Sequence, residues 1–483
     1  MGLENGTSVE KWSRVAAVLV AVFFLGTSLY IASKRLFWYD EIYTVVLSRL
    51  PDLSTIWSAL LAGADHVPIP GLILVRLSEL LFGQGEFAAR LPSVLALAAG
   101  MLVTFDCVRR LTDGLHGLIA EAVLACSFLP FYGYEARMYA VYFLFSALAL
   151  WLWLHTAEAS RPAACAFGAV FMIATMFHYY FILGLVPYLL YELVRRHKPS
   201  SKTIAGVVGS ILALLLLSPQ FAASRKITSN PGWWATPSLG KLHYVPTEFF
   251  PAGMFLLGVM MVGVAVAGRR GPAKVPAMSD GERLSWLFLT IPVAGYFLAE
   301  LVTNSFSRRY FINALPGIAM AFSCLVHRQF GETRRASIAI AVLLVTFGLM
   351  HQVRRVRSPE VIETFGDQQG PTKNMLAWEA TLENEGKHYI AIPEDRLLGM
   401  EAWYYSKHPE RYAILLKRGH STSQLAHYVP RLTFWTVEDL KRSARESAVV
   451  EPELSDADVR MLKDAGIRPV VRVADPIKII YLE

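Results

Sequence analysis

Long apolar runs recur along residues 15–352 of this chain and most constrain its fold. A run of about 20 apolar residues spans the hydrocarbon core of a bilayer as a helix, which satisfies its own backbone hydrogen bonds there. An outer-membrane barrel would instead show alternating strands of about 10 residues. With 54% hydrophobic and 18% charged residues among 483, the chain is predicted to be a polytopic helical membrane protein.

We predict about eleven transmembrane helices. The stretch "FHYYFIL" places polar aromatics in the interval 163–194 and interrupts it without a clear loop. The run 68–83 is short and carries Arg76 and Glu79 on one helix face, so we predict an interfacial helix there, not a span. The candidate spans are residues 15–33, 90–109, 115–132, 137–156, 163–179, 181–194, 203–221, 251–267, 284–302, 310–327 and 336–352.

The net charge of +7 comes from basic residues clustered in short loops, which is typical of orientation signals and not of nucleic-acid binding. The segments 195–202 and 268–274 favour an inside N-terminus, although the outer loops are also basic. No small-x-small site follows the first run, so we expect it to remain as an uncleaved span. The four cysteines lie in or beside apolar runs without a CxxC motif, which predicts buried small hydrophobes and neither disulfides nor a zinc site.

From about residue 353 the composition becomes more charged, and helical patterns alternate with strand-like runs at 388–393, 411–417, 431–435, 469–474 and 477–483. We therefore divide the chain into a membrane domain, 1–352, and a small α/β domain, 353–483. With eleven spans and an inside N-terminus, the α/β domain lies outside. In the first outer loop, 34–89, we predict a helix over 53–63 with Ser54 as its N-cap.

The predicted outer loops share an unusual content of charged and aromatic residues. Charges at the edge of a membrane are costly, so they are functional candidates by default. The loops hold, in order, Asp40, Glu41 and His66; Arg90 at the start of the second span; Glu135 and Arg137; His178; Trp233 and Trp234; and Arg308, Arg309 and Tyr310.

These residue types suit group transfer from a lipid carrier. An acceptor hydroxyl needs a carboxylate base beside it, and a phosphate leaving group needs cations, for which the arginine fork is well shaped. We expect Asp40, Arg137 and Arg308–Arg309 to converge on one extracytoplasmic cavity.

Five segments, taken in order, resemble the GT-C glycosyltransferases that use polyprenyl-phosphate sugars, nearest to the family 39-like and aminoarabinose- or galacturonosyl-transferase-like bacterial enzymes. The resemblance covers about residues 10–330 and departs from the family pattern where Val67 replaces a proline after His66. The segments are "FWYDEIYT" (37–44), "DHVPIPGLILVRLSELLFG" (65–83), "EFAARLPSVLALAAG" (86–100), "YGYEARMYA" (132–140) and "RRYFINALPG" (308–317).

The resemblance implies roles for the loop residues, each with a structural alternative. Asp40 would act as general base with Glu41 beside it, although two acids here could simply favour a helix N-terminus. Arg137, Arg308 and Arg309 would bind the donor phosphate, unless they are flanking charges. The supporting residues would be Glu135, His66, Arg90, His178 and Tyr310. Their structural alternatives are, in the same order, an ion-pair partner, a loop support, a snorkelling anchor, a belt aromatic and a packing residue.

The predicted function is transfer of a sugar from a polyprenyl-phosphate donor to an acceptor hydroxyl, with inversion, on the outer side of a bacterial inner membrane. The acceptor would be a cell-envelope polysaccharide, a glycolipid such as lipopolysaccharide, or a protein; no nucleic-acid partner is expected. No cofactor is assigned, and a divalent metal is left open, because Asp40, Glu135 and His66 lack metal-ligand spacing. The alternatives are a lipid or glycan transporter (flippase), for which no repeated halves are visible, and an inactive scaffold.

Overall fold

The computed structural model describes residues 2–229, 233–250, 253–267, 277–358, 369–393, 398–416, 427–429, 431–451, 456–474 and 477–482. Its backbone contacts divide the chain into two compact units. The first unit comprises residues 1–33 and 66–357, and the second comprises residues 34–65 and 358–483. The predicted boundary at 352 assigned residues 34–65 to the membrane domain, whereas the contacts group them with the C-terminal residues.

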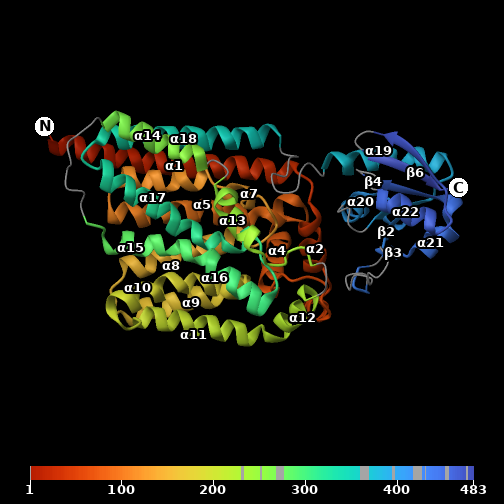
Figure 1. The fold of residues 1–483 in the computed structure, drawn as a ribbon, viewed down its shortest axis with the longest axis horizontal. Helices are drawn as coiled ribbons and strands as arrows, with labels where there is room; N and C mark the ends of the chain where they lie inside the picture. The colour runs from red at the N-terminus through yellow and green to blue at the C-terminus, as the bar shows by residue number, and fades with distance from the viewer. Residues whose placement is uncertain are drawn as a thin grey trace. The chain divides into compact units, whose positions relative to one another are not determined.

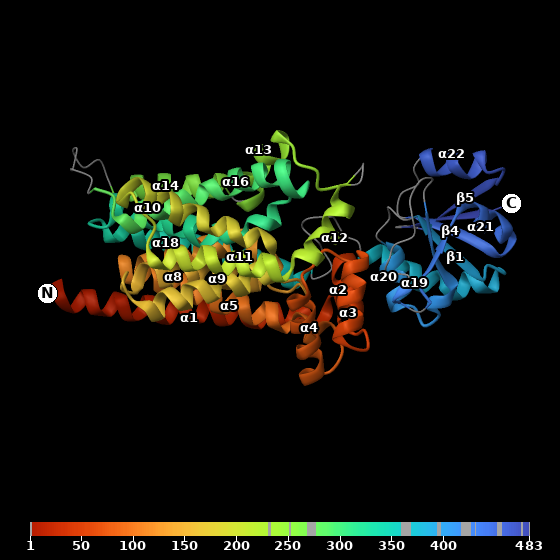
Figure 2. The same cartoon turned by 90° about the horizontal axis from the view of Figure 1, so that it is seen from below.

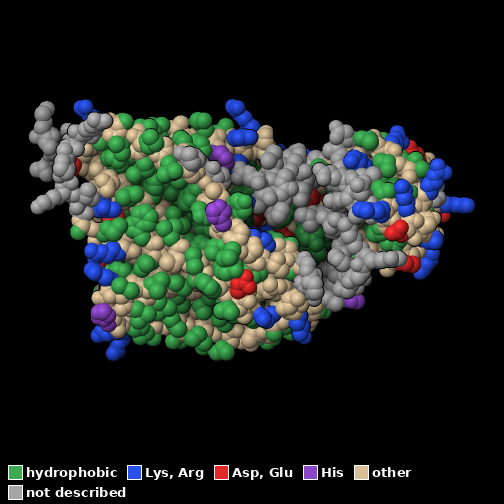
Figure 3. Space-filling view, in the orientation of Figure 1, with side chains coloured by type: hydrophobic (Ala, Val, Ile, Leu, Met, Phe, Trp, Pro, Cys, Tyr) green, Lys and Arg blue, Asp and Glu red, His purple; other side chains and the backbone are tan. Residues whose placement is uncertain are grey.

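The first unit is helical (Figure 1), and hydrophobic side chains cover much of its visible surface (Figure 3). Among the described residues of this unit, five helical segments are long and apolar enough to cross a membrane, or six if the pair α11–α12, bent by 73°, counts as one span. Its helices are α1 (Gly2–Lys34), α4 (Ile69–Phe82), α5 (Glu86–Leu111), α6 (Gly114–Ala125), α7 (Leu129–Tyr132), α8 (Tyr139–His155), α9 (Arg161–Phe177), η1 (Tyr179–Leu185), α10 (Val186–Arg196), α11 (Ser201–Leu216), α12 (Ser218–Thr228), α13 (Leu239–Phe249), α14 (Gly253–Ala267), α15 (Asp280–Leu287), η2 (Phe288–Thr290), α16 (Ile291–Leu298), η3 (Ala299–Thr303), η4 (Arg308–Ala314), α17 (Leu315–Phe330) and α18 (Arg334–Arg357).

The helices of this unit pack closely where small residues face each other. The closest pair is α9 with α11, where a Cβ added to Gly209 would lie 2.2 Å from the backbone oxygen of Gly168. Small residues allow membrane helices to approach in this way without a hydrophobic driving force between them. The other extensive pairs are α5 with α8, α5 with α6, α6 with α18, and α14 with α18.

Each of the eleven predicted runs contains helix among the described residues, but a count of eleven spans is not established. The run 115–132 is not one helix: α6 ends at Ala125, because Ser127 Oγ donates to Leu124 O and accepts from Leu129 N, which diverts the backbone from the helical ladder. The segment 268–274, used above to infer orientation, lies outside the described residues.

The run 68–83 forms the short helix α4, which packs on α5 and runs across the direction of α1 and α5 in Figure 2. It is absent from the helices long enough to span among those described. Its place along the membrane surface remains a prediction.

The second unit contains a six-stranded sheet in the order β3-β2-β1-β4-β6-β5. Strands β1 to β4 run parallel to one another, whereas β6 is antiparallel to its two neighbours, β4 and β5. Strand β4, which lies between β1 and β6 in the sheet, was not predicted from the sequence. The elements are α2 (Tyr39–Ser48), α3 (Leu53–Ala62), α19 (Gln369–Asn384), β1 (Tyr389–Pro393), α20 (Leu398–Tyr405), η5 (Pro409–Arg411), β2 (Tyr412–Leu415), β3 (Thr433–Trp435), α21 (Val437–Arg442), η7 (Ala444–Glu446), β4 (Ser447–Glu451), α22 (Asp456–Asp464), β5 (Pro469–Ala474) and β6 (Ile477–Leu482).

The helix predicted over 53–63 is α3, but its N-cap is Asp52 and not Ser54. The Asp52 carboxylate accepts from Thr55 N at 2.8 Å. The N-cap lies two residues before the predicted one, so Ser54 lies inside the first turn of the helix.

Candidate active site

Two arginines at the start of η4 carry the strongest positive charge of the predicted site in the first unit. Arg309 is buried, and its guanidinium carbon lies 5.6 Å from the ring centre of Tyr139 and 5.2 Å from that of Trp234. The Arg308 guanidinium lies 5.7 Å from the ring centre of Phe128. Such cation–π contacts help to hold the two guanidinium groups in place.

His178 and Tyr310 lie in an aromatic cluster beside Arg309. The His178 ring is 5.1 Å from Tyr310 and 5.2 Å from Tyr142. Tyr142 Oη also donates to Tyr310 O at 2.6 Å, which fixes α8 against η4. Both Arg137 and Arg309 act electrostatically on the His178 imidazole, so the structure brings these two predicted phosphate-binding residues to one place.

Arg137 and Glu135 belong to the irregular segment between α7 and α8. Glu135 is fully buried and Arg137 is 7% exposed. Ser93 Oγ donates to Arg137 O at 2.9 Å, which anchors this segment on α5. Glu135, Arg308 and Arg309 all act electrostatically on Tyr132, at the end of α7. The segment therefore contributes an acid and a base to the same region as η4.

The loop carrying Trp233 and Trp234 is tied to the loop before η4. Trp233 Nε1 donates to Ser305 Oγ at 3.3 Å, and Phe306 N donates to Ala235 O at 2.6 Å. The His66 ring meets Trp233 edge-on at 5.0 Å. His66 thus contacts the loop that carries Trp233 and Trp234 through an aromatic ring.

The turn after His66 is held by one buried amide. Gln220 of α12 is fully buried, its Nε2 donates to Val67 O at 2.7 Å, and its Oε1 accepts from Ile69 N at 3.2 Å. This pair of hydrogen bonds fixes the backbone where Val67 replaces the family proline. Gln220 was not singled out from the sequence, because no local pattern links it to Val67, which lies 153 positions away.

Arg90 occupies a different environment. It is fully buried, and its guanidinium donates to Ala32 O near the end of α1 at 3.0 Å. This contact ties the start of α5 to the end of α1.

Asp40 and Glu41 belong to the second unit and lie in the first turn of α2. Glu41 is fully buried, and its Oε2 accepts from Trp38 N, the N-cap residue of α2, at 3.1 Å. That contact gives Glu41 a structural role at the helix N-terminus. Asp40 precedes it and is half-buried, which leaves it as the more suitable carboxylate for chemistry.

Helix α20 holds the segment that carries Asp40. Tyr405 Oη accepts from Phe37 N at 2.6 Å, and Tyr404 Oη accepts from the Arg49 guanidinium at 2.7 Å. One helical turn earlier, Glu401 accepts from the backbone of Tyr39. Three residues of one helix thus contact the segment on both sides of Asp40.

Glu401 is buried, and desolvation raises its pKa to about 8, although hydrogen bonds from Thr372 and the Tyr39 backbone and the charge of Arg35 act in the opposite direction. The Thr372 hydroxyl donates to it at 2.6 Å. Glu401 therefore acts as a hydrogen-bonding support for α2.

The described residues contain one group of three or more side chains with metal-ligand geometry, Asp113, His116 and His327. It lies away from Asp40, Glu135 and His66 in the sequence and includes none of them. The arrangement around Arg137 and Arg309 can instead bind an anion through guanidinium groups and close it off with aromatic rings.

Two aromatic residues of this cluster, Tyr139 and Tyr142, were not singled out from the sequence. They lie near Tyr180, which contacts the Tyr310 ring at 5.0 Å and hydrogen-bonds the Thr303 hydroxyl. The density of tyrosines in "YGYEARMYAVYF" (132–143) was the available signal for Tyr139 and Tyr142. Aromatic belts give the same pattern, so the sequence alone could not separate the two.

Comparisons with known proteins agree with this fold. Residues 65–222 match the family model described as dolichyl-phosphate-mannose-protein mannosyltransferase. Among curated proteins, undecaprenyl phosphate-alpha-4-amino-4-deoxy-L-arabinose arabinosyl transferase 2 of Proteus mirabilis (strain HI4320) is 29% identical over 148 residues, which is 30% of this chain and 26% of that relative.

Two solved structures share the architecture over nearly the whole chain. The apo structure of ArnT from Cupriavidus metallidurans has a TM-score of 0.60 at 13% identity and covers 98% of both chains. The structure of the same protein bound to undecaprenyl phosphate has a TM-score of 0.57 at 13% identity and covers 97% of both. The resemblance to the GT-C superfamily, and to its aminoarabinose-transferase-like members, is confirmed.

Proposed function

We propose that this chain, which has the ArnT-like fold of a multi-pass membrane protein, is a glycosyltransferase that moves a sugar from a polyprenyl-phosphate donor to an acceptor hydroxyl. The observation that carries this proposal is the pair of buried arginines, Arg137 and Arg309, whose charges both act on His178 in the aromatic cluster with Tyr310. Buried cations are costly unless they are used. A lipid phosphate is an anion that a membrane protein can receive there.

The arginines fit the charge that develops during transfer. The acceptor oxygen forms a bond to the anomeric carbon, the bond from that carbon to the phosphate oxygen breaks, and the lipid phosphate gains one negative charge. Fixed guanidinium groups stabilise such a charge most in a site that excludes water. We assign Arg137 and Arg309 to the leaving phosphate, with Arg308 beside them.

Asp40 accepts the proton of the acceptor hydroxyl in this proposal. It lies on a helix whose N-terminal turn is fixed by Glu41 and by three residues of α20. A positioned base of this kind contributes about 10²–10⁴-fold to a rate. The base and the phosphate-binding arginines are supported by the remaining candidate residues, Glu135, His66, Arg90, His178 and Tyr310.

The names of the relatives suggest the first donors to try, undecaprenyl-phosphate aminoarabinose and a polyprenyl-phosphate mannose. We place the reaction and the α/β domain on the extracytoplasmic side of a bacterial inner membrane, because the basic segment 195–202 fits the opposite side. The acceptor is a cell-envelope glycolipid, polysaccharide or protein.

The test is to incubate the reconstituted protein with labelled donors and cell-envelope acceptors and to measure release of polyprenyl phosphate. Asp40→Asn should lower the rate by about 100-fold or more. The matched control is Asp52→Asn, which lies in the same loop and keeps its helix cap, because asparagine caps as well as aspartate. Equal rates for Asp40→Asn and wild type would reject the base assignment.

If the wild type moves the intact donor between leaflets without releasing lipid phosphate, the protein is a transporter and the proposal is wrong. If neither release nor movement occurs with any donor, it acts as a binding scaffold. Only transfer of labelled sugar to an acceptor supports an enzyme.

A further inference from the structure

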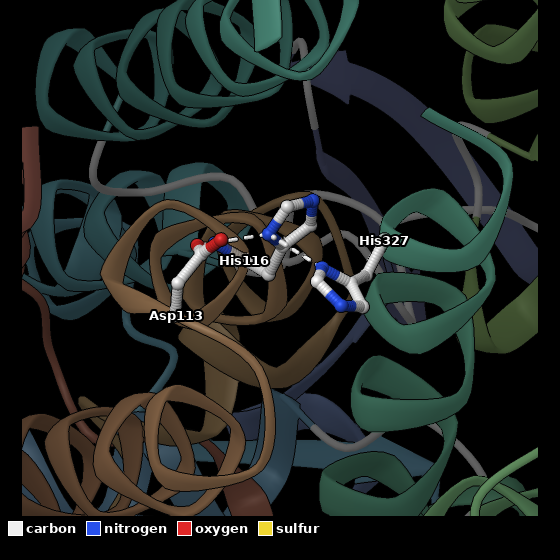
Figure 4. A group of neighbouring side chains, drawn as sticks. All are labelled: Asp113, His116 and His327. Carbon is white, nitrogen blue, oxygen red and sulfur yellow. Dashed lines mark hydrogen bonds and ion pairs between the residues drawn. The ribbon is translucent and has the colours of Figure 1, made fainter. Parts of the chain in front are cut away.

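Three side chains of the first unit, which the proposed reaction does not use, meet where α6 begins and α17 ends (Figure 4). His116 Nδ1 lies 2.8 Å from Asp113 Oδ1 and 3.3 Å from His327 Nδ1. One ligand atom from each residue lies within 4.8 Å of the other two. Two imidazoles and a carboxylate therefore direct their ligand atoms toward a common point.

Hydrogen bonds alone do not satisfy the ligand atoms of Asp113, His116 and His327 together. If His116 Nδ1 carries a proton, that proton is shared between the Asp113 carboxylate and a facing His327 nitrogen. If it carries none, its lone pair faces a carboxylate at 2.8 Å. A divalent cation would satisfy all three ligand atoms at once.

The spacing and the ligand types favour zinc. In a tetrahedral site with zinc–ligand bonds of about 2.0–2.1 Å, neighbouring ligand atoms are separated by about 3.3 Å. The two imidazole nitrogens already have this separation, whereas the contact of His116 with the Asp113 carboxylate, at 2.8 Å, must lengthen. Imidazole nitrogens suit zinc, whereas magnesium and calcium prefer oxygen ligands.

The surrounding structure holds the ligands in place. Asp113 caps α6 by accepting from His116 N at 3.0 Å, and Ser323 Oγ of α17 donates to His116 O at 2.5 Å. His116 is 2% exposed, while the Asp113 side chain is 41% exposed. The open side leaves room for water as a fourth ligand, as in zinc sites with three protein ligands.

We propose that Asp113, His116 and His327 form a zinc site with one water-filled position, which ties the beginning of α6 to the end of α17. The site is separate from the proposed transfer chemistry, whose residues it does not share. No bond of the substrate is made or broken there.

The test uses the full-length protein, purified through an affinity tag without histidines, stripped with a chelator and reloaded with zinc alone. After gel filtration, the wild type should retain zinc that His327→Ala lacks, measured by mass spectrometry of the metal. Cobalt in place of zinc should give the intense visible absorption of a tetrahedral nitrogen and oxygen site. Asp113→Asn keeps the helix cap but should weaken cobalt binding by about tenfold or more.

His197→Asn is the matched control, because His197 is exposed, and asparagine tolerates its left-handed backbone at φ 58°. It should bind zinc as the wild type does. Wild-type protein without zinc and without the cobalt spectrum would overturn the proposal. Zinc retained equally by His327→Ala and Asp113→Asn, or lost in Asp40→Asn instead, would overturn it too, since the metal would then lie elsewhere.

Discussion

Arg309 is the residue in which charge and shape can be separated experimentally. It lies between the rings of Tyr139 and Trp234. Lysine keeps the charge but loses both the planar stacking and the two-pronged contact to phosphate. We expect Arg309→Lys to lower kcat/KM for the labelled donor by about 10–100-fold, from a loss of about 1.4–2.7 kcal/mol, with the larger part in kcat.

The matched control for Arg309→Lys is Arg225→Lys, an exposed arginine at the end of α12. Steady-state release of polyprenyl phosphate measures both variants. If the two substitutions have the same effect, Arg309 does not bind the leaving phosphate.

Glu401 gives the second unit a predictable pH dependence. Desolvation raises its folded pKa to about 8 from a reference value of 4.5. A group with a raised folded pKa stabilises fully below its unfolded pKa, and that contribution is lost as the pH rises through the folded value. Protection of residues 398–405 from hydrogen exchange, corrected for the intrinsic rate, should therefore fall between about pH 5 and pH 9.

Glu401→Gln mimics the protonated side chain, so its protection should vary less with pH than that of the wild type. Glu446→Gln, an exposed control in the same unit, should follow the wild type. A pH profile that is unchanged in Glu401→Gln would show that this carboxyl is not the titrating group.

At the scale of elements, the closest helix contact can be tested with a single methyl group. A Cβ at Gly209 would meet the backbone oxygen of Gly168 at 2.2 Å, and a backbone atom cannot rotate away. Gly209→Ala should therefore separate α9 from α11 and destabilise the protein by about 1–3 kcal/mol, measured by unfolding in mixed micelles.

Gly26→Ala provides the comparison, because Gly26 also lies inside a helix but has nothing within 4 Å of an added Cβ. Alanine favours a helix by up to about 1 kcal/mol over glycine, so this variant should be neutral or slightly more stable. Equal destabilisation by both substitutions would mean that the α9–α11 contact is not the limiting one.

The elements that sequence reasoning placed well are those with strong local signals. Apolar length located the helices, and the alternating runs located β1, β2, β3, β5 and β6. The pattern failed where a side chain competes with the backbone, as Ser127 does at the end of α6. It also missed β4, whose short apolar run carries no turn signal on its N-terminal side.

At the scale of the whole molecule, the sequence could name the site residues but not their neighbours. The contact of Phe37 with Tyr405 joins positions 368 residues apart, and no local pattern encodes it. The same holds for the contact between His66 and Trp233. Motif order identified the charged residues, whereas the supports Gln220, Tyr405 and Glu401 required the folded chain.

The proposed orientation in the membrane rests on where the cations lie, and it gives the last prediction. Helix α10 ends in Arg195 and Arg196, with Lys198 and Lys202 close behind. Such clusters are retained on the cytoplasmic side during insertion.

A phosphatase that is active only outside the cytoplasm should be active when fused after residue 483 and inactive when fused after residue 198 in a truncated chain. A fluorescent reporter that matures only in the cytoplasm should give the opposite pattern at both positions, which controls for expression. Phosphatase activity at both positions, or at neither, would contradict an odd number of crossings between them and would move the α/β domain to the same side as the basic segment.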